Sequence, residues 1–241
     1  MRWENLLVTL DLLRGIEGIC QHSPEGVAMD HTGSRPTSAT LVATRLQLHG
    51  IAECLFAGPE YRATGEIALQ VTPGGFGTTA GPELRLEGLE LVAGDRRAPA
   101  AGSLGDLADR LGVEFGAPAI YRGGSGAQPD DVVDLDPAAT QLILGWYVLS
   151  DAALRMLDPD QQPILWPEHF DVAILLDDRS YGSSPGDDFY SAPYAYVSAS
   201  DHDRGPFWNV PFGALRDAGD FASAPDLVAF WREGQALLSG V

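Results

Sequence analysis

Apolar residues recur every three or four positions in several segments of the chain, which is the spacing of an amphipathic helix. The segments with this spacing are 3–19, 37–57, 104–111, 136–157 and 225–238. Proline lacks a backbone N–H and clashes with the preceding turn, so Gly58-Pro59 is expected to end the second helix. Ser103 is a typical N-cap for the third helix, and Pro137 suits the first position of the fourth.

Other segments alternate apolar and polar residues, as half-buried strands do. This alternation occupies 65–72, 83–92, 166–178 and 190–197. Residues 205–212 are aromatic but interrupted by prolines, which favours an edge strand. The stretches 73–79 and 179–186 contain several Gly, Ser or Thr residues and are expected to form a turn and a loop. The pattern predicts an α+β fold in which antiparallel sheets are flanked by helices.

The order of the predicted elements divides the chain into parts. These are an N-terminal helix and linker (1–36), a first α+β half (37–115), a glycine-containing linker (116–135) and a second α+β half (136–241). Both halves have the order helix, two or three strands, helix, so an internal repeat of α-β-β-(β)-α units is a hypothesis that fits the pattern. We expect the parts to form one compact unit with a cleft between the halves.

Charge restricts the classes of partner. The 241 residues include 34 acidic and 15 basic side chains, which gives a formal net charge of −19, and every basic residue is arginine. Because lysine is absent, Schiff-base chemistry through a lysine amine is excluded. A strongly acidic surface repels phosphate backbones and anionic lipids, so neither nucleic acid nor a membrane is an expected partner.

Cysteine content and hydropathy bear on the compartment. Cys20 and Cys54 are the two cysteines, so no disulfide framework is expected and a reducing setting fits. No export signal is recognisable, and no run approaches the roughly 18 apolar residues of a membrane span. Gly75-Phe76-Gly77 lacks the third glycine of a dinucleotide fingerprint, so no cofactor is predicted. The sequence therefore predicts a soluble cytoplasmic protein.

The segment 166–178 combines the strongest strand signal with closely spaced ionisable groups. On a strand, His169 and Asp171 share one face, so the carboxylate can fix the imidazole tautomer and leave the other ring nitrogen as an acid or base. We therefore predict His169 as the catalytic acid or base, Asp171 as its orienting partner and Glu168 as a secondary polar group. A contact to a ligand without catalysis and a purely structural hydrogen bond between His169 and Asp171 are the alternatives.

Aromatic residues are concentrated in the second half of the chain. Tyrosine and tryptophan fill protein cores, but they also present a polar tip to a ligand. The predicted ligand-binding residues are Trp166, Tyr181, Tyr194, Tyr196, Trp208 and Asn209.

Two patterns bear on metal binding. Four carboxylates would meet at the mouth of a hairpin if 170–178 paired with 189–197, and such a cluster could hold Ca²⁺. These carboxylates are Asp177, Asp178, Asp187 and Asp188. His49 and Glu53 are four residues apart on one helix and could supply two metal ligands. Neither pattern has the spacing of an established metal motif, so no metal site is predicted.

Five blocks of the sequence carry a resemblance to a known family. They are TPGGFGT (72–78), LWPEHFDVA (165–173), SPGD (184–187), PYAYV (193–197) and FWNVPFGA (207–214). In this order they resemble the signature blocks of a large family of uncharacterised bacterial proteins, most familiar from high-GC Gram-positive genomes. Members carry a His and a Glu shortly before the PYxYV block, where this chain has Tyr190-Ser191-Ala192. The resemblance covers about residues 37–240 and implies a shared fold, without a particular reaction.

Three hypotheses about function follow. The first is a cytoplasmic small-molecule-binding protein or enzyme with a pocket near His169 and Asp171. The second is a non-catalytic interaction module that docks, or forms a homodimer, through the helix at 3–19. The third is a divalent-metal-binding protein. A cavity beside His169 would favour the first hypothesis, and a flat surface with an exposed apolar helix would favour the second.

Overall fold

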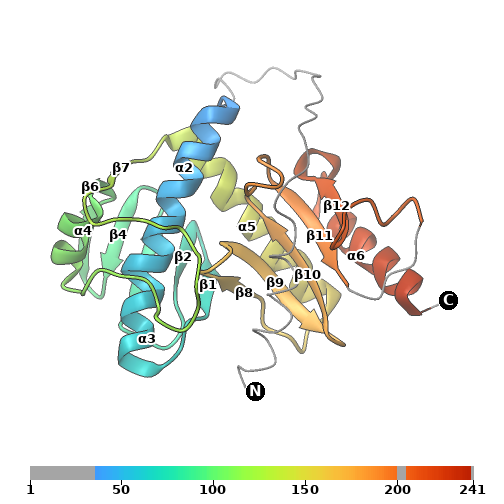
Figure 1. The fold of residues 1–241 in the computed structure, drawn as a ribbon, viewed down its shortest axis with the longest axis horizontal. Helices are drawn as coiled ribbons and strands as arrows, with labels where there is room; N and C mark the ends of the chain where they lie inside the picture. Colours follow the sequence, from blue (N-terminus) through green and yellow to red (C-terminus); the bar gives the residue numbers. More distant parts are fainter. Residues whose placement is uncertain (1–35, 200–204, 240–241) are drawn as a thin grey trace.

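The computed structural model describes residues 36–199 and 205–239. These form a ten-stranded sheet, a two-stranded sheet and the helices packed against them (Figure 1). All strand pairs of both sheets are antiparallel, so the predicted α+β class with helix-flanked antiparallel sheets is confirmed. The predicted helix at 3–19 and most of its linker lie outside the described residues. No helix within the described ranges is long and apolar enough to cross a bilayer.

The first helical segment is longer than predicted. It runs through α2 (Ser38–Gly50), the π-helical η2 (Ile51–Ala57) and α3 (Gly58–Thr64), so the prediction that Gly58-Pro59 ends the helix was wrong. The Gly58 N–H donates to the carbonyl of Glu53, five residues back. In the same pattern, the N–H of residue 59 would donate to the carbonyl of Cys54. Proline cannot, but the Cys54 carbonyl accepts a hydrogen bond from the N–H of Gly116 instead. The Gly116 N–H thus satisfies the carbonyl that Pro59 leaves without a donor in the helix.

The remaining helices follow their local signals. They are α4 (Leu104–Leu111), α5 (Pro137–Leu157), the short 3₁₀ turn η3 (Ala218–Asp220) and α6 (Ala224–Ser239). Ser103 caps α4 by accepting from the N–H of Asp106, and Gly112 ends it in the left-handed conformation. Asp136 caps α5 by accepting from the N–H of Ala139.

The first half and the predicted linker supply seven strands. These are β1 (Leu69–Thr72), β2 (Gly75–Thr78), β3 (Leu84–Glu87), β4 (Glu90–Ala93), β5 (Arg96–Pro99) and β6 (Ala101–Ser103) in the first half, and β7 (Val132–Asp134) in the linker. The stretch predicted as a turn at 73–79 is largely strand β2, which pairs with β1. The alternating segment at 83–92, in which Gly88 is expected to be a bulge or a tight turn, is the hairpin β3–β4, and Gly88 makes its turn at a φ of 60°.

The second half supplies β8 (Ile164–Trp166), β9 (Asp171–Leu176), β10 (Arg179–Ser184), β11 (Tyr194–Ser198) and β12 (Gly213–Asp217). The strand predicted at 166–178 is wrong as one element, because Phe170, at a φ of 54°, turns the chain between β8 and β9. The loop predicted at 179–186 is mostly β10. Asp177 and Asp178, at φ of 50° and 61°, form the two-residue turn that joins β9 to β10. The edge strand is β12 rather than 205–212.

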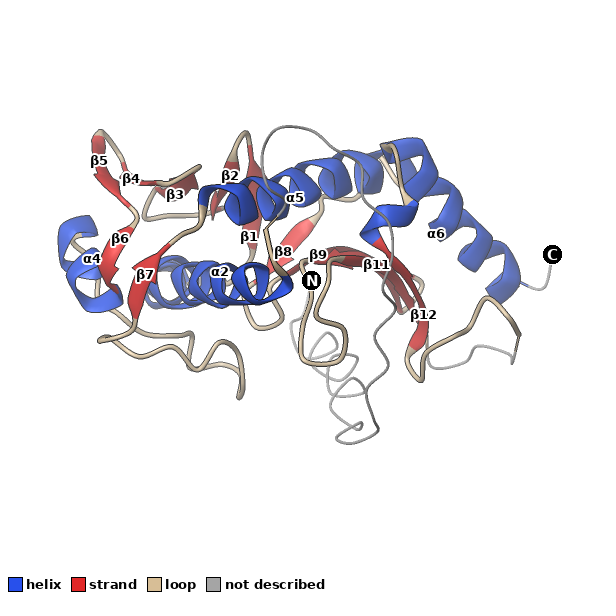
Figure 2. Cartoon of the chain, turned by 90° about the horizontal axis from the view of Figure 1, so that it is seen from above, coloured by secondary structure: helices blue, strands red, loops and turns tan. Residues whose placement is uncertain are grey.

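The strands of both halves join in one sheet with the order β12-β11-β10-β9-β8-β1-β2-β3-β4-β5. The halves meet between β1 and β8, whose register has one pair, Leu69 opposite Leu165. Helices α5 and α6 lie together over one face of strands β9, β11 and β12 (Figure 2). One core of buried residues runs through both halves, from Leu41 to Trp231. The internal repeat stays a prediction.

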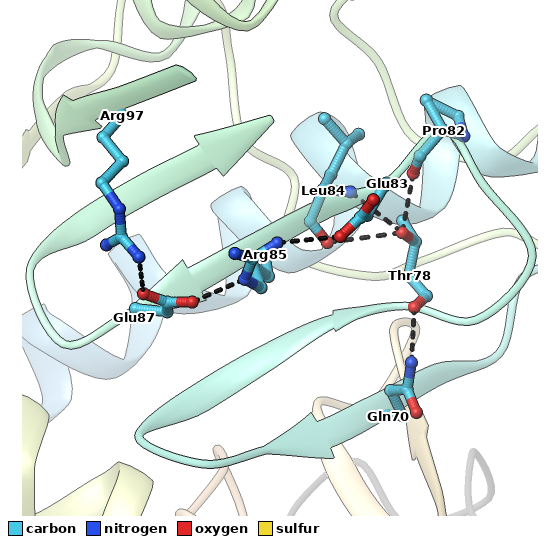
Figure 3. Close-up of polar contacts among 8 residues, drawn as sticks. All are labelled: Gln70, Thr78, Pro82, Glu83, Leu84, Arg85, Glu87 and Arg97. Carbon is cyan, nitrogen blue, oxygen red and sulfur yellow. Dashed lines mark hydrogen bonds and ion pairs between the residues drawn. The ribbon is translucent and has the colours of Figure 1, made fainter. Parts of the chain in front are cut away.

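On the face of β3–β5 that carries Arg85 and Arg97, charged side chains form a chain of ion pairs (Figure 3). Arg85 contacts Glu83 at 3.1 Å and Glu87 at 2.5 Å, and Arg97 contacts Glu87 at 2.6 Å and Glu90 at 3.1 Å. Each of the three glutamates in this series of ion pairs contacts an arginine.

Candidate functional site

A cavity of about 470 Å³ opens between α2 and the sheet of the second half. Six parts of the chain line it: α2, the connection at 124–125, the β8–β9 turn, the β10–β11 loop, β11 and Phe212 just before β12. The lining side chains that concern the chemistry are Arg45, His49, Ser125, Glu168, His169, Asp171, Asp187, Asp188, Tyr194 and Tyr196.

The β8–β9 turn positions the predicted acid–base pair. The N–H of Phe170 bonds the Trp166 carbonyl at 2.8 Å, and the hydroxyl of Tyr147 donates to the Phe170 carbonyl at 2.6 Å. The buried Phe170 ring also packs edge-on against Phe76 and Tyr147. These contacts hold Phe170 in a conformation that a bulky residue rarely adopts, and His169 and Asp171 on either side of it both line the cavity.

Asp171 is 9% exposed, and its Oδ2 accepts a hydrogen bond from the Tyr196 hydroxyl. Its Oδ1 and the Nε2 of His169 are both buried and have no hydrogen-bond partner within residues 36–199 and 205–239. Burial raises the pKa of Asp171, and the electrostatic interaction with His169 and the hydrogen bond from Tyr196 only partly oppose this. The predicted direct hydrogen bond between His169 and Asp171 is not formed; the aspartate bonds a tyrosine instead.

A second carboxylate–tyrosine pair lies beside the first. Asp187 accepts the Tyr194 hydroxyl at 2.6 Å on Oδ2, and the N–H groups of Phe189 and Tyr190 at 2.8 and 2.7 Å on Oδ1. The rings of Tyr194 and Tyr196 are 6.1 Å apart on the same face of β11, as their spacing predicted. Burial raises the pKa of both phenols, so they are neutral hydrogen-bond donors near pH 7.

Helix α2 contributes Arg45 and His49, which are one turn apart. His49 Nε2 lies 2.7 Å from the Pro167 carbonyl and its ring stacks on Phe170 at 5.2 Å between centroids. Burial lowers the pKa of His49 to about 4, so the ring is neutral at pH 7 and Nε2 donates its proton to Pro167. Arg45 is 6% exposed, and its Nη1 donates to the carbonyls of Asp187 and Ser191 at 3.4 Å each.

Glu53, on the π-helical turn η2, does not line the cavity itself but bonds Ser125, which does. One of its oxygens accepts the N–H and the hydroxyl of Ser125, at 2.7 and 2.5 Å. Burial raises the pKa of Glu53, and the two bonds from Ser125 partly offset this. Gly124 adopts a φ of 87°, and a Cβ there would lie 1.7 Å from the Glu53 carboxylate. The stretch at 116–135 predicted as a linker therefore also forms one wall of the cavity, because its backbone follows this carboxylate closely.

The structure brings together five of the nine predicted site residues. Glu168, His169, Asp171, Tyr194 and Tyr196 all line the cavity. The other four lie elsewhere. Trp166 packs beside the tyrosines without reaching the cavity, and Tyr181 points into the main core. Trp208 packs edge-on against Phe207, and Asn209 bonds the N–H and carbonyl of Leu215 on the edge strand.

The sequence did not mark Arg45 as a site residue. His49 and Glu53 were considered together, as two possible metal ligands on one helix. The helical spacing placed His49 and Glu53 close, but each bonds backbone or side chains from a distant segment. A basic residue amid the apolar stripe of a helix is the one signal that could have marked Arg45 as buried. Phe189 and Phe212, which contact each other at the cavity rim, carry no local signal.

The four aspartates considered for a cation do not meet. Asp177 and Asp178 lie at one end of β10, whereas Asp187 and Asp188 follow its other end, about 20 Å away for a six-residue strand. The hairpin proposed between 170–178 and 189–197 does not exist, because β10 pairs between them. Among the described residues, no group of three or more His, Cys, Asp or Glu side chains could hold a metal ion.

No family model, curated protein or solved structure matches this chain significantly. The resemblance of its sequence blocks to a bacterial family therefore stays an expectation, and the site has to be interpreted from its own geometry.

Proposed function

We propose that the protein binds a small molecule in this cavity, with His169 and Asp171 in direct contact with the ligand. The observation that carries the proposal is a pair of buried polar atoms without partners in the described ranges, His169 Nε2 and Asp171 Oδ1, on two residues that both line the cavity. A buried polar atom without a partner costs about 1–3 kcal/mol. A ligand that bonds both atoms removes this cost and gains affinity from it.

The same geometry is suited to proton transfer. An imidazole beside a buried carboxylate can take a proton from a bound molecule, and the negative charge of Asp171 then stabilises the imidazolium. The neutral hydroxyls of Tyr194 and Tyr196 already donate to Asp187 and Asp171, so they fix the carboxylates rather than the ligand. In this proposal, His169 is the acid or base, and Asp171 stabilises its charged form. A cytoplasmic location belongs to the same proposal, on the basis of cysteine content.

A fragment screen by thermal shift tests the binding function. We expect some fragments to raise the melting temperature of the wild-type chain by several degrees and to lose this effect on His169→Gln and Asp171→Asn. Asp178→Asn is the matched control, because it makes the same isosteric change in the exposed turn between β9 and β10. If every fragment shifts all four proteins equally, the cavity is not the binding site.

The two other hypotheses gain no support from the described residues. The helix at 3–19, on which docking or dimerisation depends, lies outside them and stays a prediction. A divalent-metal function would need a ligand group that the described ranges do not contain.

A further inference from the structure

The charges around the cavity favour a cation. Four carboxylates line it, Glu168, Asp171, Asp187 and Asp188, against the single guanidinium of Arg45. His49 is neutral at pH 7, because burial lowers its pKa to about 4. Arg45 directs Nη1 at the backbone carbonyls of Asp187 and Ser191, and Asp187 and Asp188 are the nearest charges that stabilise it. Within the described residues, no arginine is therefore paired with Asp171.

Asp171, which is buried, and Asp187, which is partly buried, differ in what they can still accept. Both oxygens of Asp187 hold hydrogen bonds, from Tyr194 and from two backbone N–H groups. Asp171 has one oxygen occupied by Tyr196, and its Oδ1 lacks a partner in the described ranges although the residue is nine-tenths buried. Beside it, His169 Nε2 can accept a second N–H when the ring carries its proton on Nδ1. A carboxylate oxygen and an imidazole nitrogen that both accept hydrogen bonds match the donors of an ammonium group.

Aromatic and apolar residues also line the cavity. Tyr194, Tyr196 and Phe170 are among them, and the Tyr196 hydroxyl donates to Asp171. At the rim, Leu46 and Phe189 are each 49% exposed, and Phe189 meets Phe212 edge-on with 5.5 Å between centroids. Aromatic faces attract organic cations, and an exposed apolar rim gains from contact with an apolar substituent.

From these contacts we infer that the cavity takes a small organic cation, a primary ammonium group carrying an apolar or aromatic substituent. The ammonium donates one N–H to Asp171 Oδ1 and a second to His169 Nε2, and the substituent packs against Leu46, Phe189 and Phe212. The inference rests on the proposed function and narrows its ligand to one chemical class.

Calorimetric titration of the full chain with three probes of similar shape tests this class. The probes are benzylamine, benzyl alcohol and benzoate at pH 7 and low salt. We expect benzylamine to bind at least tenfold more tightly than benzyl alcohol, and benzoate not to bind. Asp171→Asn should lower the affinity for benzylamine at least tenfold and change that for benzyl alcohol less than twofold, whereas Asp178→Asn should change neither.

Each other outcome overturns the inference. Tighter binding of benzoate would mean that Arg45 selects an anion, equal binding of amine and alcohol would mean that charge is not recognised, and no binding of any probe would exclude the class. The ratio measured on the wild-type chain decides the matter even if Asp171→Asn does not fold. If the fragment screen finds ligands that depend on His169 while benzylamine fails, the ligand class is wrong and the binding function stands.

Discussion

The polar side chains at the two ends of the sheet differ in burial and in pairing. On β3–β5, Arg85 and Arg97 pair with glutamates at the surface, and each of these charges has a partner (Figure 3). On β9–β11, Asp171 is buried under Tyr196, and one of its oxygens lacks a partner in the described ranges. Surface charges are solvated whether or not they pair, so the first arrangement adds little to stability or function. A buried acceptor without a partner costs free energy, and its presence at a cavity is what a binding site requires.

The largest effect is expected where the two regions are joined. Phe170, which is 1% exposed, contacts Phe76 of the first half, His49 at the cavity and Tyr147 of α5. Phe170→Ala should lower the free energy of unfolding by about 3–5 kcal/mol in urea denaturation, because it leaves a cavity in the core. Phe189→Ala, at the exposed rim, is the control and should cost far less. Equal losses would mean that Phe170 does not join the regions.

The next effect is a pH dependence that belongs to the cavity end. Burial lowers the pKa of His49 to about 4 from 6.5, so its contribution to stability is fully present above pH 6.5 and is lost as the pH falls through 4. The loss can reach about 3 kcal/mol. His49→Gln keeps a donor for the Pro167 carbonyl and should reduce the fall in stability between pH 6.5 and 4, measured by urea denaturation. A slope identical to that of the wild type would contradict the burial of a neutral imidazole.

A moderate effect is expected at the tyrosine that partners Asp171. Tyr196→Phe leaves a buried carboxylate with no hydroxyl donor and should cost about 1–3 kcal/mol at pH 7. The cost should shrink at lower pH, because the pKa of Asp171 is raised by burial and the neutral carboxyl needs its partner less. Tyr190→Phe, which removes the 2.9 Å bond to the more accessible Asp217, is the matched control. A larger loss for Tyr190→Phe would reverse the comparison.

The smallest effect is expected at the surface end of the sheet. Arg97→Gln removes contacts to Glu87 and Glu90, both solvated, and should leave the denaturation midpoint unchanged within error. The pKa of Glu87, which hydrogen bonds from Arg85 and Arg97 lower, should rise in the variant when followed by NMR titration. A loss of stability equal to that of Tyr196→Phe would show that the two ends of the sheet do not differ.

Elements with local signals were predicted correctly. Helix α4 begins at the Ser103 cap and ends at Gly112, because capping involves groups within one turn. The alternation of 171–176 also placed Val172 and Ile174 in the core and Asp171 and Ala173 on the other face. The predictions failed where a distant group intervened. Gly116 satisfies the carbonyl that Pro59 leaves open, and Tyr147 holds the Phe170 turn that splits the predicted strand.

The candidate site, too, was predictable from the sequence only in part. The sequence by itself determined the fold class, the acidic charge, and the neighbourhood of His169, Asp171, Tyr194 and Tyr196, because period-two alternation and short spacings are properties of adjacent residues. Only the tertiary structure decided that Arg45 and His49 face them, that Ser125 closes the wall and that the four aspartates lie apart. Those contacts join residues tens of positions away in the chain, and their geometry depends on the pairing of strands and the packing of α2, which no local pattern encodes.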